Sequence, residues 1–392
     1  MNFTLKAKRP SGARLGIFSF EPCYRKRKLD ENGHSEKNDQ STTTIKSVMY
    51  ETPMFFVHSR NASIPHITWE VADNLSDDNL PLLIAMPEIA NLKEVLDATK
   101  QNLKSFANID CKRPVFSIIQ DPVQGIKTGI NDKHGVSVWS TAGKHHFDLK
   151  SYLALQEVLQ VDGFQILCDN DTPKDASKKR LNYTVTRTID YLEAFSENSP
   201  VSEMSRVFGT VVGGFDLKLR EESARKAADC SVAGYIIEGF HQYGLETIDL
   251  DMGAVSPVLK IIIDNLPEDK PKAMFGMLNL DKVKQLIEEG IDIFDSSYVS
   301  YLTENSTVLL LDNNESIGHH LIKIDDVSFK DDHSLLSKYC SCYVCKQAFT
   351  KAYINHLLET KEMLGSVLLM LHNLHQFSLW FRNMRIVLSK NE

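Results

Sequence analysis

Short apolar runs alternate with helix-like segments over most of this 392-residue chain, and this alternation restricts the fold more than any other feature. Apolar runs without polar alternation are typical of strands that are covered on both faces, as in a parallel sheet. Repeated strand–helix units therefore favour an α/β fold. The expected strands are 54–57, 80–85, 115–119, 163–168, 208–214, 234–238, 273–277 and 291–295, and the expected helices are 89–106, 149–159, 177–197, 220–229, 255–266 and 280–289.

About eight such units favour closure into a (β/α)₈ TIM barrel. An open doubly wound sheet is the alternative, but no glycine-rich phosphate loop follows the first strand. We predict a TIM barrel with an N-terminal β addition and a C-terminal zinc-binding helical module. The expected domains are residues 1–50 (N-terminal strands and a polar insert), 51–305 (barrel body) and 306–392 (β interlude, zinc-binding module and C-terminal helices).

Composition excludes several classes of protein. The net charge of −8 argues against binding of nucleic acid through the overall field of the chain. Three of the seven cysteines are clustered and four are scattered, which suits a reducing compartment better than a disulfide framework. No signal peptide precedes the first strand, and no run of about 18 apolar residues occurs. We expect a soluble intracellular protein.

The cysteine cluster predicts a metal site. Cys340, Cys342 and Cys345 lie within six residues, a spacing that brings three thiolates around one ion. Three thiolates and one imidazole are the ligands of a closed, structural zinc site. A helix-like run follows and carries His372, which we predict as the fourth ligand; His356 and His375 are rivals. In the simpler interpretation, the cysteines and His372 only pack in a core.

Two further segments have competing interpretations. Arg25–Lys28 is a basic cluster in a polar stretch; it is interpreted as a solvated loop, with phosphate contact as the alternative. The tail carries an apolar stripe that includes Leu379, Trp380, Met384 and Val387. We expect this stripe to pack on the barrel, and a surface for a partner is the alternative.

The C-terminal part resembles the zinc module of tRNA-guanine transglycosylases, which are TIM-barrel enzymes that replace a guanine in the tRNA anticodon loop. The similarity lies in the three cysteines and in the runs Ala352-Tyr353, His356–Leu358, Glu362–Gly365 and His372–Leu374. Gly290–Asp295 is similar to the strand that ends in the nucleophilic aspartate of these enzymes, and Pro65-His66 with Thr68 matches their Pro-His-Leu-Thr stretch. The resemblance covers most of the chain and places Asp295 at the nucleophile position.

Other catalytic features of the family are absent. The stretch that carries the base in the enzymes corresponds to Phe116–Gly125, which lacks the paired glycines. The purine-pocket segment is represented by Gly213–Leu219 and a second glycine loop by Ala273–Leu278, each altered. Ser296–Tyr301 replaces a segment with an arginine. A nucleophile without a base or a pocket cannot complete a double displacement. We therefore expect no catalytic residue, with Asp295 as a relic of the nucleophile position or a structural residue.

This pattern resembles the non-catalytic subunits of the eukaryotic members of the family, as do Gly135–Ser140, Lys178–Arg180 with Arg187, and Leu266–Pro271. The resemblance implies one structural Zn²⁺ per subunit and a heterodimer with a catalytic subunit, packed around the zinc modules. It implies that the complex exchanges guanine for queuine at the wobble position of tRNAs with GU(N) anticodons, in the cytoplasm or peripherally on the mitochondrial outer membrane. Basic candidates for tRNA contact are Lys178, Lys179, Arg180, Arg382 and Arg385.

Two alternatives remain open at this point. One is a self-sufficient transglycosylase homodimer that uses Asp295 as nucleophile with a displaced base such as Asp121 or Asp169. In the sequence, Asp121 is first of all a turn residue before Pro122. The other alternative is a zinc-stabilised barrel that binds free queuine for storage or salvage.

Overall fold

Eight parallel strands close into a barrel in the computed structural model, which describes residues 1–20, 47–72, 80–125, 131–204 and 206–390. The last barrel strand pairs with the first, with Ile293 opposite Met54 and Asp295 opposite Phe56. The predicted TIM barrel is confirmed, and the open sheet is wrong. In chain order the strands are β4 (Met54–His58), β5 (Leu82–Ala85), β6 (Val115–Ile118), β9 (Gly163–Gln165), β10 (Val207–Val211), β11 (Gly234–Ile237), β12 (Lys272–Ala273) and β13 (Ile293–Asp295).

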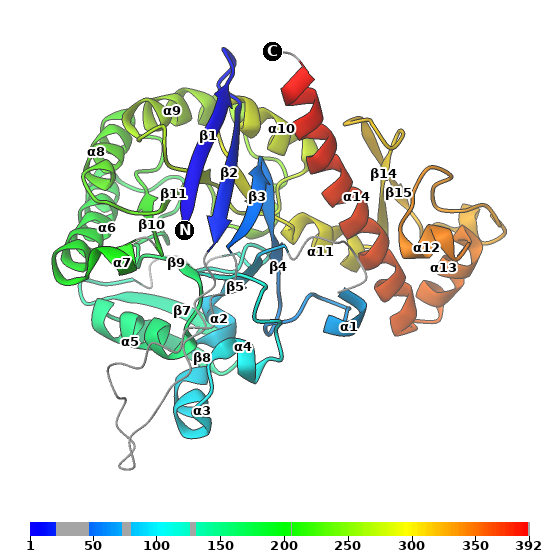
Figure 1. The fold of residues 1–392 in the computed structure, drawn as a ribbon, viewed down its shortest axis with the longest axis horizontal. Coiled ribbons are helices and arrows are strands. Elements are labelled where there is room, and N and C mark those ends of the chain that lie inside the picture. Colours follow the sequence, from blue (N-terminus) through cyan, green and yellow to red (C-terminus); the bar gives the residue numbers. More distant parts are fainter. Residues whose placement is uncertain (21–46, 73–79, 126–130, 205, 391–392) are drawn as a thin grey trace.

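Helices surround the barrel (Figure 1). The long helices agree with the sequence pattern to within a few residues, but the single helix expected over 89–106 is wrong. Lys100 adopts a left-handed φ of 57°, which ends one helix, and the side chain of Asn102 accepts a hydrogen bond from the Ser105 amide, which starts another. The helices are α1 (Trp69–Ala72), α2 (Met86–Ile89), α3 (Leu92–Thr99), α4 (Leu103–Phe106), α5 (Leu149–Leu159), α6 (Lys178–Asn198), α7 (Val201–Met204), α8 (Leu217–Ala228), η1 (Gly244–Thr247), α9 (Met252–Asn265), α10 (Leu280–Glu288) and α11 (Ser297–Glu304).

A three-stranded antiparallel sheet covers the end of the barrel at which the strands begin. It consists of β1 (Asn2–Lys8), β2 (Arg14–Phe20) and β3 (Val48–Thr52), which lie side by side in Figure 1. Phe18 and Phe20 of β2 are fully buried, and their ring centroids lie 6.1 Å from those of Phe208 and Phe56, respectively. Aromatic pairs at this separation fill the barrel end and exclude water from it. The sequence pattern did not predict β3.

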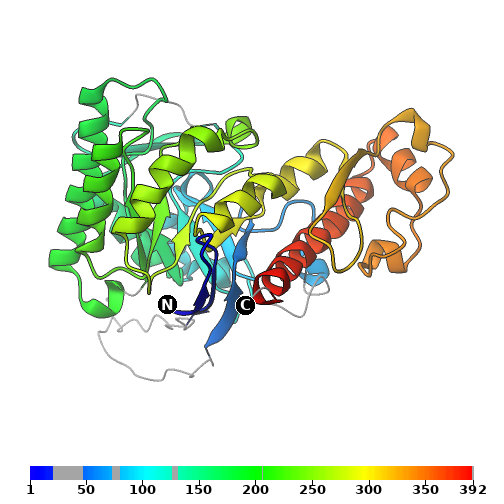
Figure 2. The same ribbon diagram turned by 90° about the horizontal axis from the view of Figure 1, so that it is seen from above.

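The C-terminal part lies beside the barrel, and the long helix α14 runs between the two (Figure 2). On α14, the rings of Phe377 and Phe381 lie 4.9 and 5.1 Å from that of Phe55 in β4. Trp380 and Met384 are also buried, so packing on the barrel is the correct interpretation of the apolar tail. The elements are β14 (Thr307–Leu311), β15 (His319–Lys323), η2 (Val327–Phe329), α12 (Tyr343–Lys346), α13 (Lys351–Glu359) and α14 (Met363–Lys390).

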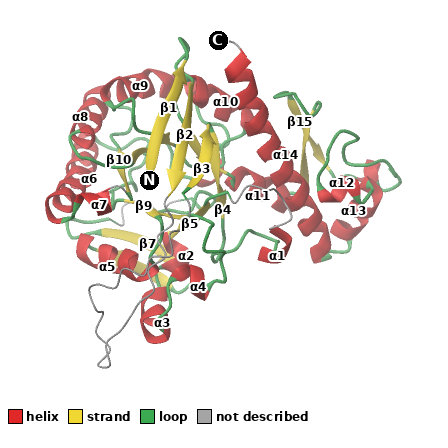
Figure 3. Ribbon diagram, in the orientation of Figure 1, coloured by secondary structure: helices red, strands yellow, loops and turns green. Residues whose placement is uncertain are grey.

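One further hairpin, β7 (Val136–Ser140) and β8 (Gly143–Phe147), is inserted between β6 and α5 and was not predicted as strands (Figure 3).

Two predictions fall on residues that the structure does not describe, because Arg25–Lys28 and Cys23 lie outside the described ranges. Within the residues that are described, none of the helices combines the length and apolarity needed to cross a bilayer. The domain boundaries at 50/51 and 305/306 stay predictions.

Candidate metal centre and barrel mouth

Three thiols and one imidazole meet between the knuckle and α14. The Nδ1 atom of His372 lies 3.8, 3.5 and 3.6 Å from the Sγ atoms of Cys340, Cys342 and Cys345. All four side chains are buried, and their ligand atoms lie within 4.8 Å of one another. His356 and His375 lie outside this group: His356 is exposed, and His375 contacts the Ser341 hydroxyl at 3.5 Å. The structure therefore brings together the four residues that the sequence predicted.

Hydrogen bonds orient each part of this Cys₃His cluster. The Nε2–H of His372 donates to the Leu309 carbonyl at 3.0 Å, which leaves the Nδ1 lone pair directed at the sulfurs. The backbone amide of Cys342 donates to the Cys340 sulfur, and that of Cys345 donates to the Cys342 sulfur. Amide donors stabilise sulfur as a thiolate. The pKa of Cys340 is far below its usual range, chiefly because the thiols of Cys342 and Cys345 lie within hydrogen-bonding reach of its sulfur.

This geometry fits a tetrahedral zinc ion. With Zn–S near 2.3 Å and Zn–N near 2.05 Å, tetrahedral angles place a sulfur and a nitrogen about 3.6 Å apart. The three S···N distances of 3.5 to 3.8 Å match this value without rearrangement. Four protein ligands leave no position for water, so such an ion would stabilise the fold and would not catalyse a reaction.

Asp295 ends β13 at the opposite mouth of the barrel from the N-terminal sheet, and its carboxylate accepts two backbone amides. Oδ2 accepts the backbone N–H of Gly276 and Oδ1 accepts that of Ser297, each at 2.7 Å. The residue is only 3% exposed, and burial raises its pKa. Gly276 has a φ of +150°, a region that favours glycine and directs its amide at the acid. Each oxygen of Asp295 thus accepts one backbone amide from a neighbouring loop.

The neighbouring part of this mouth is filled by the protein itself. Glu238, which follows β11, accepts hydrogen bonds at 2.7 Å from each of Gln165 Nε2, Asn170 Nδ2 and Tyr243 OH. A carboxylate with three donors is satisfied without a ligand. Beside it, the fully buried Arg220 donates to the carbonyls of Val211 and Gly214, and its guanidinium lies 4.1 Å from the centroid of the Phe240 ring. These contacts occupy the loops after β10 and β11.

Asp169, one of the two alternative bases, is neutralised by arginines. Both Arg180 and Arg187 contact its carboxylate, at 2.6 and 2.9 Å, and Arg180 also pairs with Asp171. These ion pairs lower the pKa of Asp169 although burial opposes this. Arg180 is thus held by two ion pairs, and Arg385 donates to the Pro53 carbonyl. Their role as tRNA contacts stays a prediction. Lys178, Lys179 and Arg382 remain exposed.

Asp121, the other alternative base, belongs to a buried trio with His58 and Glu88. His58 Nε2 lies 3.3 Å from Asp121 Oδ1, and one ligand atom from each residue lies within 4.8 Å of the other two. Burial raises the pKa of Glu88 to about 8. Burial also disfavours protonation of His58, but the hydrogen bond and the charge of Asp121 outweigh it and raise the pKa of His58. The sequence pattern missed His58 and Glu88, and Asp121 is more than the turn residue expected there.

Comparison with known proteins identifies the family. The family profile described as "Queuine tRNA-ribosyltransferase" matches residues 40–392, which is 353 of 392 residues. The chain belongs to the queuine tRNA-ribosyltransferase family. Its resemblance to the non-catalytic subunits within that family is confirmed as well, by curated relatives that are named "Queuine tRNA-ribosyltransferase accessory subunit 2".

Three of these relatives show how far the similarity extends. The protein from Ixodes scapularis is 36% identical over 351 residues, covering 86% of this chain and 89% of the relative. The one from Anopheles gambiae is 31% identical and covers 87% and 81%. That from Caenorhabditis elegans is 29% identical and covers 88% and 93%. The similarity therefore spans both the barrel and the C-terminal module.

Proposed function

We propose that this chain is the non-catalytic subunit of a heterodimeric queuine tRNA-ribosyltransferase. In this proposal the complex exchanges guanine for queuine at the wobble position of tRNAs with GU(N) anticodons. The state of Asp295 carries the proposal: its two oxygens accept backbone amides at 2.7 Å each, and its side chain is almost fully buried. A carboxylate that is buried and already holds two loop amides is poorly placed to attack a ribose, which supports a chain that acts through a catalytic partner.

The surface of the C-terminal module supports a partner contact there. Met363 and Val327 are 86% and 80% exposed, and Tyr339, Tyr343 and Tyr353 are each at least 40% exposed. Exposed aromatic and methionine side chains are enriched at the centres of protein interfaces. We propose that the catalytic subunit packs on this surface, next to the Cys₃His cluster, and that one structural Zn²⁺ holds the surface in shape.

We also propose that tRNA binds across the complex, with the exposed Lys178, Lys179 and Arg382 of this chain as candidate phosphate contacts.

The proposed cellular location is the cytoplasm, with peripheral association at the mitochondrial outer membrane. The described cysteines form no disulfide, which is consistent with a reducing compartment. Fractionation of cells that express the labelled chain, with and without a salt wash of the mitochondria, tests this residence.

Labelled-guanine exchange into tRNA tests the role. We expect no exchange by the purified chain alone, and exchange by the chain together with the catalytic subunit. Asp295→Ala in this chain should leave the activity of the complex within about twofold, because no step passes through that carboxylate. Exchange by the lone chain that Asp295→Ala abolishes would instead establish the self-sufficient homodimer.

A pair of surface variants tests the interface. Met363→Glu places a charge in the proposed contact and should weaken co-elution with the catalytic subunit at least tenfold. Leu245→Glu is the matched control, because Leu245 is 65% exposed but lies on η1 of the barrel body. Equal effects of the two variants would argue against the module surface as the contact.

A further inference from the structure

Three neighbouring barrel strands bring His58, Glu88 and Asp121 to one point. β4 pairs with β5 and β5 pairs with β6, all in parallel. His58 is the last residue of β4, Glu88 lies on α2 directly after β5, and Asp121 lies three residues after β6. The carboxyl ends of parallel strands meet at one edge, so residues about 30 positions apart become neighbours.

The imidazole of His58 is held in place from its other side. Its Nδ1 atom lies 3.1 Å from the Ser300 hydroxyl, and its backbone amide donates to Ser296 Oγ at 3.0 Å. Nε2 therefore faces Asp121 in a fixed orientation. Asp121 is fixed too, since its Oδ1 accepts the Val123 amide at 2.9 Å. Metal-ligating histidines are commonly oriented in this way by a hydrogen bond at the second ring nitrogen.

Three carboxylate oxygens of the trio have no donor among the described residues. Asp121 Oδ2 is one of them. The other two are the oxygens of Glu88, which have no donor in full hydrogen-bonding geometry, although the backbone amides of Asn61 and Ala62 act on the carboxyl group and lower its pKa. Asp121 is only 2% exposed. A buried carboxylate oxygen without a partner destabilises the fold unless a proton or a cation neutralises it.

The trio sets two carboxyl groups against one imidazole, and because the pKa of Glu88 is about 8, a bound cation would displace the proton of Glu88. Asp295 adds a third carboxyl group within electrostatic range of His58. Arg60, whose charge acts on Asp121, forms its hydrogen bond with Glu304, at 2.8 Å. A divalent cation would balance the two carboxylates and supply the partner that their oxygens lack.

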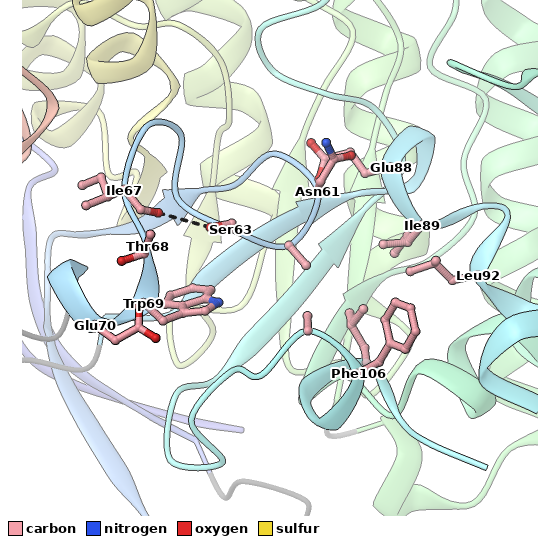
Figure 4. Close-up of a pocket in the computed structure, with 13 residues that line it drawn as sticks. Asn61, Ser63, Ile67, Thr68, Trp69, Glu70, Glu88, Ile89, Leu92 and Phe106 are labelled. Carbon is pink, nitrogen blue, oxygen red and sulfur yellow. Dashed lines mark hydrogen bonds between the residues drawn. The ribbon is translucent and has the colours of Figure 1, made fainter. Parts of the chain in front are cut away.

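A cavity lies next to this point. It encloses about 450 Å³ between the β4–α1 loop, α2 and α4, and Glu88 is among its lining residues (Figure 4). Trp69, Ile89 and Phe106 line its apolar part. Glu88 thus belongs both to the wall of the cavity and to the trio, and because its two oxygens are buried, an ion would enter from the cavity past this side chain.

We propose that His58, Glu88 and Asp121 bind a divalent transition-metal ion at the carboxyl ends of β4 to β6, separate from the Cys₃His cluster. One imidazole with two carboxylates suits Mn²⁺, Fe²⁺ or Zn²⁺. Ligand atoms of one such ion lie roughly 3–4 Å apart, so the present separations of up to 4.8 Å require the side chains to tighten slightly. Three protein ligands leave positions for water or for an oxygen ligand from the cavity.

Mn²⁺ is the probe for the test, because it is a hard ion that a thiolate cluster binds poorly. The full chain, carrying one zinc per molecule, is titrated with Mn²⁺ and followed by electron paramagnetic resonance. We expect one bound Mn²⁺ per chain in addition to zinc, with a nitrogen modulation from an imidazole in the spin-echo spectrum. His58→Gln should remove the nitrogen signal, and Glu88→Gln or Asp121→Asn should weaken binding at least tenfold.

Glu70→Gln is the matched control. Glu70 lines the same cavity but lies outside the trio, so Mn²⁺ affinity should stay within twofold. The wild-type spectrum decides the proposal even if a variant fails to fold. Absence of Mn²⁺ binding below about 1 mM, bound Mn²⁺ without a nitrogen signal, or equal loss in Glu70→Gln would each overturn it.

Discussion

Replacement of His372 by alanine should release the C-terminal module from α14. The side chain supplies one of four ligands and also donates Nε2–H to the Leu309 carbonyl at 3.0 Å. At a zinc concentration about 1,000 times Kd, metal binding stabilises the folded state by about 4 kcal/mol. The unpaired, buried Leu309 carbonyl costs about 1–3 kcal/mol more. His372→Ala should therefore destabilise the module by about 5–7 kcal/mol.

Zinc content and hydrogen exchange measure this effect. We expect His372→Ala to lose the zinc equivalent in elemental analysis, and amides over 331–350 to exchange much faster while those of the barrel strands change little. His375→Ala is the matched control, because His375 lies one turn further along α14 and outside the cluster. If His372→Ala retained stoichiometric zinc, or lost it without faster exchange, the structural role of the cluster would be refuted.

Three further substitutions test the packing of the barrel. Arg180→Ala removes one of the two arginines that contact Asp169 and also the ion pair with Asp171, and it should cost about 3–5 kcal/mol in denaturant unfolding. Its exposed neighbour Lys179→Ala should cost less than about 0.5 kcal/mol. Burial lowers the pKa of His241 from 6.5 to about 4, so protonation of this side chain favours the unfolded chain. The free energy of unfolding should therefore fall by about 3 kcal/mol between pH 6.5 and pH 4. His241→Asn should remove that part of the pH dependence. Trp380→Ala should cost about 3–5 kcal/mol, against less than about 1 for the exposed Ile386→Ala, measured by the same unfolding assay.

The local sequence pattern was sufficient to predict those helices and sites whose caps or ligands lie within their own segment of the chain. α5 agrees with its predicted range, because Asp148 caps it and Gln160 ends it in a left-handed conformation. The Cys₃His cluster was also predictable, since three of its ligands are adjacent in sequence. β3 was missed because it is short and its residue types do not follow its burial: Met49 is exposed, whereas Thr52 is buried.

The trio at the barrel mouth shows what local patterns cannot supply. His58, Glu88 and Asp121 are each unremarkable in their own segments, and they meet only because β4, β5 and β6 are adjacent. A sequence signal did exist, since each residue lies at or just after the end of an expected strand. A search for polar side chains at successive strand ends would have grouped them. Glu238, just after β11, would have been found in the same way.

The pairing of β13 with β4 also has a consequence for biosynthesis. Asp295 lies opposite Phe56, 239 positions earlier in the chain. The ribosome must therefore deliver nearly three quarters of the polypeptide before the first barrel strand meets its last neighbour. Until then one edge of β4 exposes unpaired peptide groups, which other nascent chains can join. Contacts of such large sequence separation also slow folding, so chaperone demand should be highest just before translation reaches β13.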